Sequence, residues 1–330
     1  MVRSAAIRGA SGALGPMGLA QNLRHHTASG LAYSRVLGGA WPVSSGAMSD
    51  LPDRVRLVIF DLDGVVYRGN EPIHGARELV DFLHAAGVAV RFATNNSMVA
   101  REGYVERLGA MGIQARADEI VTSTSATVEH LRRHAPDVRS VLAIGADGMR
   151  AELAAAGLEV TMAGEIRSAG HGGGPLGRRH DAVIVGLDPD VDYWSLAVAM
   201  SAVAGGARLI ATNADARYPT PSGFLPGAGA ILAALTTATG ETAEVIGKPS
   251  PAMFAAILEA SGIGADEAVV IGDNPDADVV GAHRAGIAAI LVLTGVADAS
   301  SAAALDGERR PEAIAADPDE VRSLLAGRLR

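Results

Sequence analysis

The sequence predicts an α/β protein built on a parallel β-sheet with crossover helices, into which a smaller α/β domain is inserted. Short continuous runs of Val, Ile and Leu alternate with helical stretches from residue 55 to about 136, and the same alternation returns after residue 250. Such runs are typical of strands that are buried on both faces of a parallel sheet. The segment between the two parts has strands and helices of its own. We therefore predict a first domain of residues 48–136 plus 226–330 and an inserted domain of residues 137–225.

The first part of the outer domain shows three strands that alternate with three helices. Gly87 and Gly112 end the first two helices, because glycine readily adopts the left-handed conformation that follows a helix C-terminus. The predicted strands are residues 56–61, 88–94 and 119–123, and the predicted helices are residues 76–86, 101–111 and 125–134.

The second part repeats this pattern. Ser250 can cap a helix that has Pro251 in its first position. The predicted helices end at residues 261, 285 and 329, and the predicted strands are residues 268–272 and 287–293.

The inserted segment has its own smaller set of elements. We expect strands at residues 141–145, 182–187 and 208–212, and helices at 148–156 and 194–204. The glycine-rich residues 163–181 are expected to form a surface loop.

Residues 1–47 differ in composition from the rest of the chain. They contain four arginines and no acidic residue, are rich in Gly, Ser and Ala, and precede Met48. We expect a disordered extension or a start assigned too early, with Met48 as the true start. An organelle transit peptide is the less favoured alternative.

Composition excludes several classes of protein. The net charge is −9, and without the arginine-rich N-terminus the chain is more acidic still, so we expect no nucleic-acid partner. No apolar run reaches the roughly 18 residues of a membrane span, so no membrane is expected. The absence of cysteine excludes disulfides and thiolate metal sites, and it fits a cytoplasmic location.

Polar side chains follow several of the predicted strands at the point where each strand ends. Asp61 and Asp63 follow the first strand, "ATNNS" follows the second, and "IGDNPDAD" with Asp273 and Asp278 follows a later one. Lys248 lies in "GKPSP", before another helix. Because ligands bind beyond the carboxyl ends of parallel strands, we expect these residues to meet at one edge of the sheet.

Each of these residues taken alone is most simply a helix cap, a turn residue or a surface lysine. Four carboxylates at strand ends would repel one another, and a hard divalent cation such as Mg²⁺ relieves that repulsion. A buried strand end also holds a nucleophile rigidly. Asp61 could attack a phosphoryl group and Asp63 could act as acid and base. Lys248 would supply positive charge, and the Thr94 hydroxyl could donate to a phosphoryl oxygen.

The stretches "DLDGVVYRG", "ATNNS", "GKPSP" and "IGDNPDADVVGAHRAG" resemble, in order and spacing, the four motifs of the haloacid dehalogenase (HAD) superfamily. The best match is its subfamily IIA, the NagD-like or 4-nitrophenylphosphatase group. This resemblance covers residues 55–295. It implies a Rossmann-like core with an α/β cap, Mg²⁺ dependence and an aspartyl-phosphate intermediate.

The resemblance also implies roles for individual residues. Asp61 would be nucleophile and metal ligand, Asp63 would be acid/base and would bind the metal through its backbone carbonyl, and Thr94 and Lys248 would hold the phosphate. The fourth motif departs from the family pattern, because Ala277 stands where Thr is common, and this puts the part played by Asp278 in doubt. The implied metal ligands are Asp61, Asp63, Asp273 and Asp278, and the implied substrate contacts are Gly64, Asn95, Asn96, Thr212 and Asn213.

The expected function is hydrolysis of a small phosphate monoester, with glycerol 3-phosphate or phosphoglycolate as the favoured substrate. The resemblance also implies a homodimer that pairs through the cap. A phosphotransferase would use the same aspartyl phosphate with another alcohol as acceptor. A non-catalytic phospho-receiver or binding module would also gather acids and a lysine on a parallel sheet, but it needs no inserted domain.

Overall fold

The computed structural model describes residues 51–168, 179–220 and 223–329. The predictions for residues 1–47 and for most of the loop at 163–181 fall outside these ranges. Among the described residues, no helix is long and apolar enough to cross a membrane.

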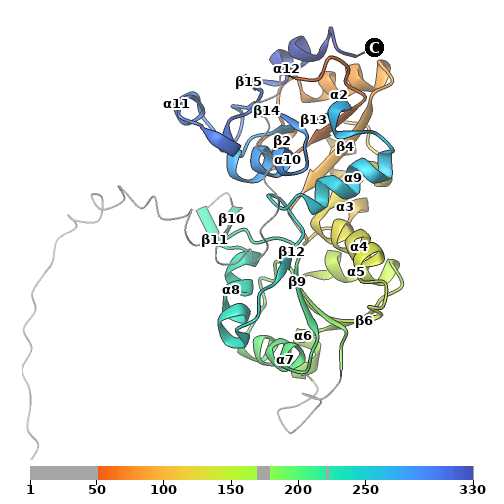
Figure 1. The fold of residues 1–330 in the computed structure, drawn as a ribbon, viewed down its shortest axis with the longest axis vertical. Coiled ribbons are helices and arrows are strands. Elements are labelled where there is room, and N and C mark those ends of the chain that lie inside the picture. The colour runs from red at the N-terminus through yellow and green to blue at the C-terminus, as the bar shows by residue number, and fades with distance from the viewer. Residues whose placement is uncertain (1–50, 169–178, 221–222, 330) are drawn as a thin grey trace, which may run out of the picture. The chain divides into compact units, whose positions relative to one another are not determined.

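The first sheet has six strands, all parallel, in the order β15-β14-β13-β1-β4-β5 (Figure 1). β1 lies at its centre, with β13 on one side and β4 on the other, and all four of its residues are buried. The strands are β1 Leu57–Phe60, β4 Ala89–Thr94, β5 Ile120–Thr122, β13 Ala268–Gly272, β14 Ala288–Val292 and β15 Ala313–Ala315.

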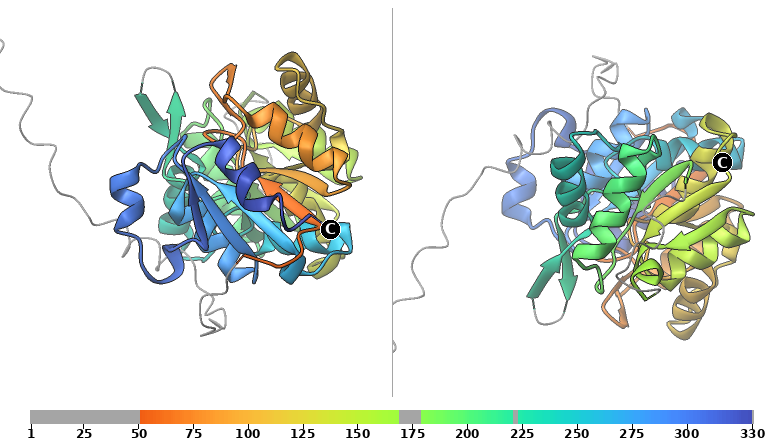
Figure 2. Two further views of the ribbon diagram at one scale, coloured as in Figure 1. Left: turned by 90° about the horizontal axis from the view of Figure 1, so that it is seen from above. Right: turned by 90° about the horizontal axis from the view of Figure 1, so that it is seen from below.

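Helices cover both faces of this sheet (Figure 2). Val58 and Phe60 of β1 share an apolar cluster with the helices α2, α3 and α12, while Leu57 and Ile59 share one with α4, α9 and α10. Burial on both faces explains why β1 is a continuous apolar run. The helices are α2 Ala76–Ala85, α3 Arg101–Ala110, α4 Ser123–His134, α9 Ala252–Ser261, α10 Val280–Arg284, α11 Ala299–Ala303 and α12 Pro318–Leu325. A short antiparallel pair, β2 Tyr67–Arg68 and β3 Glu71–Pro72, follows β1.

The second sheet has five parallel strands in the order β12-β9-β8-β6-β7. Helices α7 and α8 share an apolar cluster with one of its faces, and α5 shares one with the other. Its strands are β6 Ser140–Ile144, β7 Glu159–Met162, β8 Ala182–Val185, β9 Arg208–Ala211 and β12 Glu244–Val245, and its helices are α5 Asp147–Ala155, α6 Ala163–Ser168, α7 Tyr193–Ala204 and α8 Ala228–Thr239.

Two sequence predictions about this region need correction. β12 pairs with β9, and α8 packs in the apolar cluster of the second sheet, so the predicted domain boundary at residue 225 is too early. The elements of the second sheet continue to Val245. The loop predicted at 163–181 begins with the helix α6, because residues 163–168 are not the glycine-rich part of that segment.

The carboxyl ends of second-sheet strands lie against the segment that follows β4 of the first sheet. The hydroxyl of Ser97 accepts the backbone N–H of Leu187 at 3.1 Å. A Cβ atom placed on Gly148 would lie only 2.3 Å from the carbonyl oxygen of Met98. A hairpin of β10 Arg217–Thr220 and β11 Gly223–Pro226 follows the end of β9.

Candidate active site

Three adjacent strands bring acidic and polar residues to one edge of the first sheet. Asp61 directly follows β1, Asp273 directly follows β13, and Thr94 is the last residue of β4. The backbone N–H of Asp61 continues the sheet by donating to Ile271 at 2.8 Å. Because these strands are parallel, their carboxyl ends meet, as the sequence predicts.

Lys248 links two of the acids. Its ammonium nitrogen lies 2.5 Å from Oδ1 of Asp61, 2.7 Å from Oδ1 of Asp278 and 3.3 Å from the carbonyl oxygen of Ala93. The side chain is 4% exposed. The three N–H donors of an ammonium group thus match three acceptors.

Lys248 is also the only lysine in the 330 residues, whereas arginine is frequent. A chain that uses arginine for its other cationic side chains keeps a compact ammonium at this position. A guanidinium is planar and larger, and it could not take the place of an ammonium in this buried space without displacing its neighbours.

Burial and mutual repulsion act on every charge in this cluster. Burial raises the pKa of Asp61 well above its ordinary value; Lys248 lowers it, while Asp278 and Asp273 raise it further. Burial, followed by repulsion from Asp278, raises the pKa of Asp273 to about 7. Burial alone would lower the pKa of Lys248, but Asp278 and Asp61 outweigh it and raise that pKa. The carboxylates therefore lack enough nearby positive charge to balance them, whereas the charge of Lys248 is fully balanced by its acidic neighbours.

The residues fit a divalent cation. Carboxylate oxygens of Asp61, Asp273 and Asp278 all lie within 4.8 Å of one another, and Lys248 is the one cation in ion-pair contact with them among the described residues. The carbonyl oxygen of Asp63 accepts no hydrogen bond from the part of the chain that the structure describes. An oxygen-rich set with a net negative charge is the kind that binds Mg²⁺.

The Asp273 carboxylate is enclosed by two glycines and by a loop that the sequence predictions missed. The backbone N–H of Val296 donates to its Oδ2 at 2.6 Å. A Cβ atom on Gly295 would lie 1.9 Å from this oxygen and one on Gly64, where φ is +84°, would lie 2.3 Å from it. Thr294 donates to the carbonyl of Gly64 at 2.6 Å and holds the two segments together. Gly64, predicted to contact substrate, packs against the Asp273 carboxylate.

Asp278 is held in place although Ala277 departs from the family pattern. Its Oδ2 accepts the backbone N–H of Asn274 at 3.1 Å, and its own N–H donates to the carbonyl of Asn274 at 2.8 Å. Together with Lys248 on Oδ1, these contacts fix the carboxylate without a threonine at position 277.

Asp63 lies at the open side of the cluster. Its side chain is exposed, yet the protein atoms around it raise its pKa, while Arg107, Lys248 and the Tyr67 hydroxyl lower that pKa. The Tyr67 ring is fully buried, and the guanidinium carbon of Arg107 lies 4.2 Å from its centroid. Sequence reasoning named neither Tyr67 nor Arg107. The first lies inside the quoted first motif, but nothing in the pattern brings Arg107 to it.

Thr94 and Asn96 form a turn at the end of β4. The Thr94 hydroxyl oxygen accepts the backbone N–H of Asn96 at 3.2 Å, which leaves the hydroxyl proton available to donate. The side-chain oxygen of Asn96 accepts the N–H of Met98 at 2.8 Å.

Asn95 connects the site to Lys248 and to the segment after β9. Its Nδ2 donates to Oδ2 of Asp215 at 3.0 Å and to the carbonyl of Lys248 at 2.9 Å, and its Oδ1 accepts the N–H of Lys248 at 2.8 Å. Its carbonyl accepts from Asn213 and from Ser123, each at 2.7 Å. Both side-chain donors and the side-chain acceptor are engaged. We therefore assign Asn95 a positioning role in place of the predicted direct contact between its side chain and substrate.

Thr212 and Asn213 do lie beside the site, as the sequence predicts, but both are buried within the protein. The backbone N–H of Gly247 donates to the Thr212 carbonyl at 2.8 Å, and Asn213 contacts Asn95. The residue of this segment that faces the charged cluster is Asp215. Burial raises its pKa, Asn95 and Lys248 lower it, and Asp278 raises it. Asp215 belongs to the stretch "TNADA", so a search for carboxylates there could have found it.

Comparison with known proteins finds related family models in two separate parts of the chain. A family model described as haloacid dehalogenase-like hydrolase matches residues 58–159, and one described as HAD-hydrolase-like matches residues 245–321. The acid sugar phosphatase of Staphylococcus aureus is 35% identical over 241 residues, which are 73% of this chain and 87% of that protein.

Two solved structures are similar over most of their length. The glycerol phosphate phosphatase of Mycobacterium tuberculosis, solved in complex with magnesium, is 32% identical with a TM-score of 0.72. The match covers 83% of this chain and 78% of that one. NagD of Escherichia coli K-12 is 28% identical with a TM-score of 0.71, and the match covers 81% of this chain and 98% of that one.

Proposed function

The chain belongs to the haloacid dehalogenase superfamily and is a phosphatase of its NagD-like group, and from this premise we propose that it hydrolyses small phosphate monoesters through a phosphoryl group carried on Asp61. The observation that carries the proposal is the position of Lys248. It holds the Asp61 carboxylate at 2.5 Å beside Thr94 and within 4.8 Å of two further acids.

In the first step, an oxygen of the Asp61 carboxylate attacks phosphorus and an acyl phosphate forms. The bond from phosphorus to the alcohol oxygen breaks, and Asp63 gives that oxygen a proton. In the second step, Asp63 takes a proton from water as the water oxygen attacks phosphorus. The bond from phosphorus to Asp61 breaks, and inorganic phosphate and the free carboxylate result.

Asp63 suits the proton transfers because of where it lies. Its raised pKa makes it a better proton donor at a given pH than an ordinary aspartate, since a larger fraction of it is protonated, and its exposure gives water access to the same carboxyl group. That exposure favours water over a second alcohol as the acceptor, so we place hydrolysis before phosphotransfer.

Lys248 and Thr94 hold the transferred group by donating to phosphoryl oxygens. We propose Mg²⁺ as the cofactor, with ligands from Asp61, Asp273 and the carbonyl of Asp63, and with Asp278 supporting them. When bound, the ion offsets the charge that the phosphoryl oxygens and the carboxylates share.

We propose glycerol 3-phosphate as the first substrate to test, with phosphoglycolate as the alternative. Two of the similar proteins are named for phosphates of polyhydroxylated compounds, a sugar and glycerol. Asp215 offers a second carboxylate oxygen that could accept a substrate hydroxyl, because Asn95 donates to its Oδ2 and leaves its Oδ1 to other donors.

The test is inorganic-phosphate release from glycerol 3-phosphate, phosphoglycolate, pyridoxal phosphate and nucleoside monophosphates. Each would be measured with Mg²⁺, with EDTA and with the Asp61→Asn protein. We expect Mg²⁺-dependent release that the substitution abolishes. A preference for nucleoside monophosphates would reject glycerol 3-phosphate, and release that persists in Asp61→Asn would reject the mechanism.

A homodimer that pairs through the second sheet's domain remains a prediction, as does a cytoplasmic location. Tyr193, Trp194 and Met200 of α7 expose apolar surface on that domain. Light scattering on the purified chain tests the pairing: a mass of one chain at micromolar concentration would reject it.

A further inference from the structure

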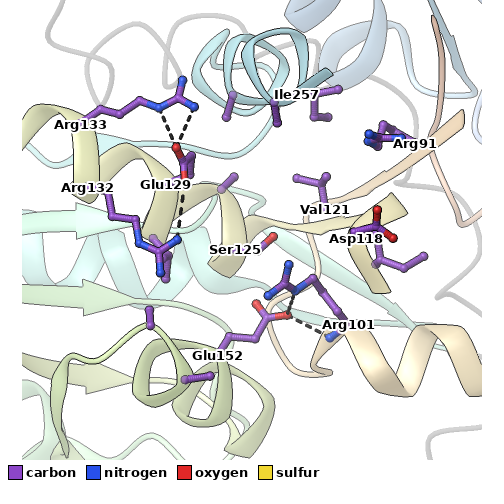
Figure 3. Close-up of a pocket in the computed structure, with 17 residues that line it drawn as sticks. Arg91, Arg101, Asp118, Val121, Ser125, Glu129, Arg132, Arg133, Glu152 and Ile257 are labelled. Atoms are coloured by element: carbon purple, nitrogen blue, oxygen red, sulfur yellow. Dashed lines mark hydrogen bonds and ion pairs between the residues drawn. The ribbon is translucent and has the colours of Figure 1, made fainter. Parts of the chain in front are cut away.

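A pocket lies away from the acidic cluster and shares no residue with it. It has a volume of about 460 Å³ and lies between β4, β5, α4 and α9 of the first domain and α5 of the second (Figure 3). Pockets of this size and at such junctions between domains are typical of sites for small molecules. None of the catalytic roles proposed above uses it.

The lining combines an apolar surface with charged groups. Val121, Ala126 and Ile257 contribute the apolar part, and four arginines and three acids contribute the charges. In the view of Figure 3, Arg132 and Arg133 lie on one side of the pocket and Arg91 on the other, with Ser125 and Arg101 between them.

The three acids of the lining already have cationic partners. Glu152 accepts from the Thr122 hydroxyl at 2.5 Å and from the backbone N–H of Arg101 at 2.9 Å, and its carboxylate lies 3.7 Å from Nε of Arg101. Glu129 contacts Arg133 at 2.7 Å. The third acid, Asp118, contacts Arg116 at 3.0 Å, outside the pocket.

Arg133 is paired with Glu129 and Glu259, but the other three arginines have hydrogen-bond donors to spare. Half-buried Arg91 donates to the carbonyl of Val90 at 2.8 Å and has no carboxylate within ion-pair distance among the described residues. Among the described residues, Arg132 has a single ion-pair contact, with Glu129 at 3.7 Å. Nε of Arg101 is buried and makes no hydrogen bond within the described part of the chain. A guanidinium has five N–H donors and no acceptor. The unused hydrogen-bonding groups of this pocket are therefore donors, and they suit a ligand that carries hydrogen-bond acceptors.

We propose that this pocket is a regulatory site for a small organic anion with an apolar body, its anionic group held by Arg91 and Arg101. The anion would be a carboxylate or a phosphate, because both accept two parallel hydrogen bonds from one guanidinium. The apolar body would lie against Val121, Ala126 and Ile257.

The position of the pocket connects it to the active site in two ways. Arg101 begins α3 and follows the turn of Thr94 and Asn96 in the sequence. Glu152 belongs to α5 and joins this helix of the second domain to Thr122 and Arg101 of the first. An anion that draws on the Arg101 guanidinium competes with Glu152, so its binding changes how α5 is held on the first domain.

The test uses three probes of one shape and different charge: benzoate, neutral benzamide and cationic benzamidine. Each is titrated calorimetrically into the full-length, metal-free protein in EDTA, so that no bound metal attracts the carboxylate. We expect benzoate to bind about tenfold more tightly than benzamide, and benzamidine not to bind, as a charge-assisted contact requires. Equal affinity for benzoate and benzamide, or no binding of benzoate, would overturn the proposal.

A substitution then locates the bound probe. Arg91→Gln should weaken benzoate about tenfold and leave benzamide unchanged, while Arg322→Gln, at an arginine of α12 that does not line the pocket, should change neither. If Arg91→Gln loses its fold by circular dichroism, Arg91→Lys, which keeps the charge but cannot donate two parallel hydrogen bonds to one anionic group, replaces it. Benzoate affinity that survives the substitution of Arg91 would overturn the site.

The regulatory part has a separate readout. Saturating benzoate should change kcat for p-nitrophenyl phosphate at least about twofold in the wild type and not in Arg91→Gln. An unchanged kcat would leave binding without regulation and reject that part. Competition with substrate that persists in Arg91→Gln would place benzoate at the acidic cluster and reject the proposal. The calorimetric result does not depend on the proposed phosphatase reaction.

Discussion

The two parallel sheets of this molecule differ most at their carboxyl edges. In the first sheet, the neighbouring strands β1 and β13 are followed by Asp61 and Asp273. In the second sheet, β6 and β8 are also neighbours, but Gly145 and Gly186 follow them. One edge collects buried charge, and the other places no ionisable side chain at the matching positions.

The second edge is closed by direct contact. A Cβ atom on Gly186 would lie 2.6 Å from the hydroxyl of Ser97, so the backbone itself packs on the segment after β4. Both sheets thus have a carboxyl edge of the kind at which ligands bind. The residues that follow the strands decide which of the two edges becomes a catalytic site. Because glycines stand at the second edge, its backbone can pack closely on the first edge and cover it.

The largest effect is expected from a change of Lys248, the one cation in ion-pair contact with the acids of the charged edge among the described residues. Lys248→Arg keeps the charge but adds bulk where the side chain is 4% exposed, and Lys248→Met leaves the acids unpaired. We expect phosphate release to fall about 10³-fold in both. The reverse exchange at the surface, Arg284→Lys, is the matched control and should keep its activity. Lys248→Arg with wild-type kinetics would contradict the assigned role.

Removal of one acid tests whether the charged edge binds a metal. Thermal unfolding should shift upward with Mg²⁺ in the wild type, equivalent to about 2.7 kcal/mol when the metal is at a hundredfold excess over its Kd. Asp273→Asn should abolish most of this shift, because the acid lies within 4.8 Å of Asp61 and Asp278. An equal Mg²⁺ shift in both proteins would place the metal elsewhere.

Asn95 is one of the contacts between the two edges, and it is the one that reaches Lys248, so its removal should loosen one edge against the other. Asn95→Ala removes the hydrogen bonds to Lys248 and Asp215, and we expect kcat/KM to fall about 10²-fold because Lys248 shifts. Asn96→Ala removes one side-chain bond, to Met98, and should lose much less. Steady-state kinetics of both variants measure the difference, and equal losses would reject the positioning role.

The ion pair of His283 and Glu312 lies away from both edges. Its contribution to stability shows the size of effect to expect from a contact with no part in catalysis. Burial lowers the pKa of His283, but Glu312 and the carbonyl of Glu308 outweigh it and raise that pKa above its ordinary value. A raised histidine pKa stabilises the fold fully below the unfolded pKa, about 6.5, and this is lost as pH rises through the folded pKa.

His283→Gln should therefore lower the free energy of unfolding by about 1 kcal/mol near pH 6 and by less near pH 9, with activity unchanged. Urea unfolding at the two pH values measures it. A larger loss at the higher pH would show that the charged form of His283 does not stabilise the fold.

Much of the first sheet could be predicted from sequence because its strands are continuous apolar runs that end in polar residues. The family indicated by the four motifs is confirmed by the comparisons. The boundary at residue 225 was wrong because α8 is an apolar helix that fits either domain, and only its packing assigns it to the second.

The roles of Asn95 and Asp215 could not be predicted because they depend on contacts between segments far apart in the chain. Gly295 was missed for the same reason, since its need for a small residue comes from Asp273. One signal in the sequence itself remained unused. A single lysine among 330 residues, placed where a motif requires an ammonium, marks Lys248 without any structure.

The most direct test of the central claim is to trap the phosphoryl group on Asp61. Asp63→Asn should still form the acyl phosphate from p-nitrophenyl phosphate, whose leaving group needs no proton, but should hydrolyse it slowly. After an acid quench with Mg²⁺ present, peptide mass spectrometry should find one phosphoryl group on Asp61, and none in the protein that also carries Asp61→Asn. A burst of p-nitrophenolate without a phosphoryl group on Asp61, or with one on another residue, would contradict the account.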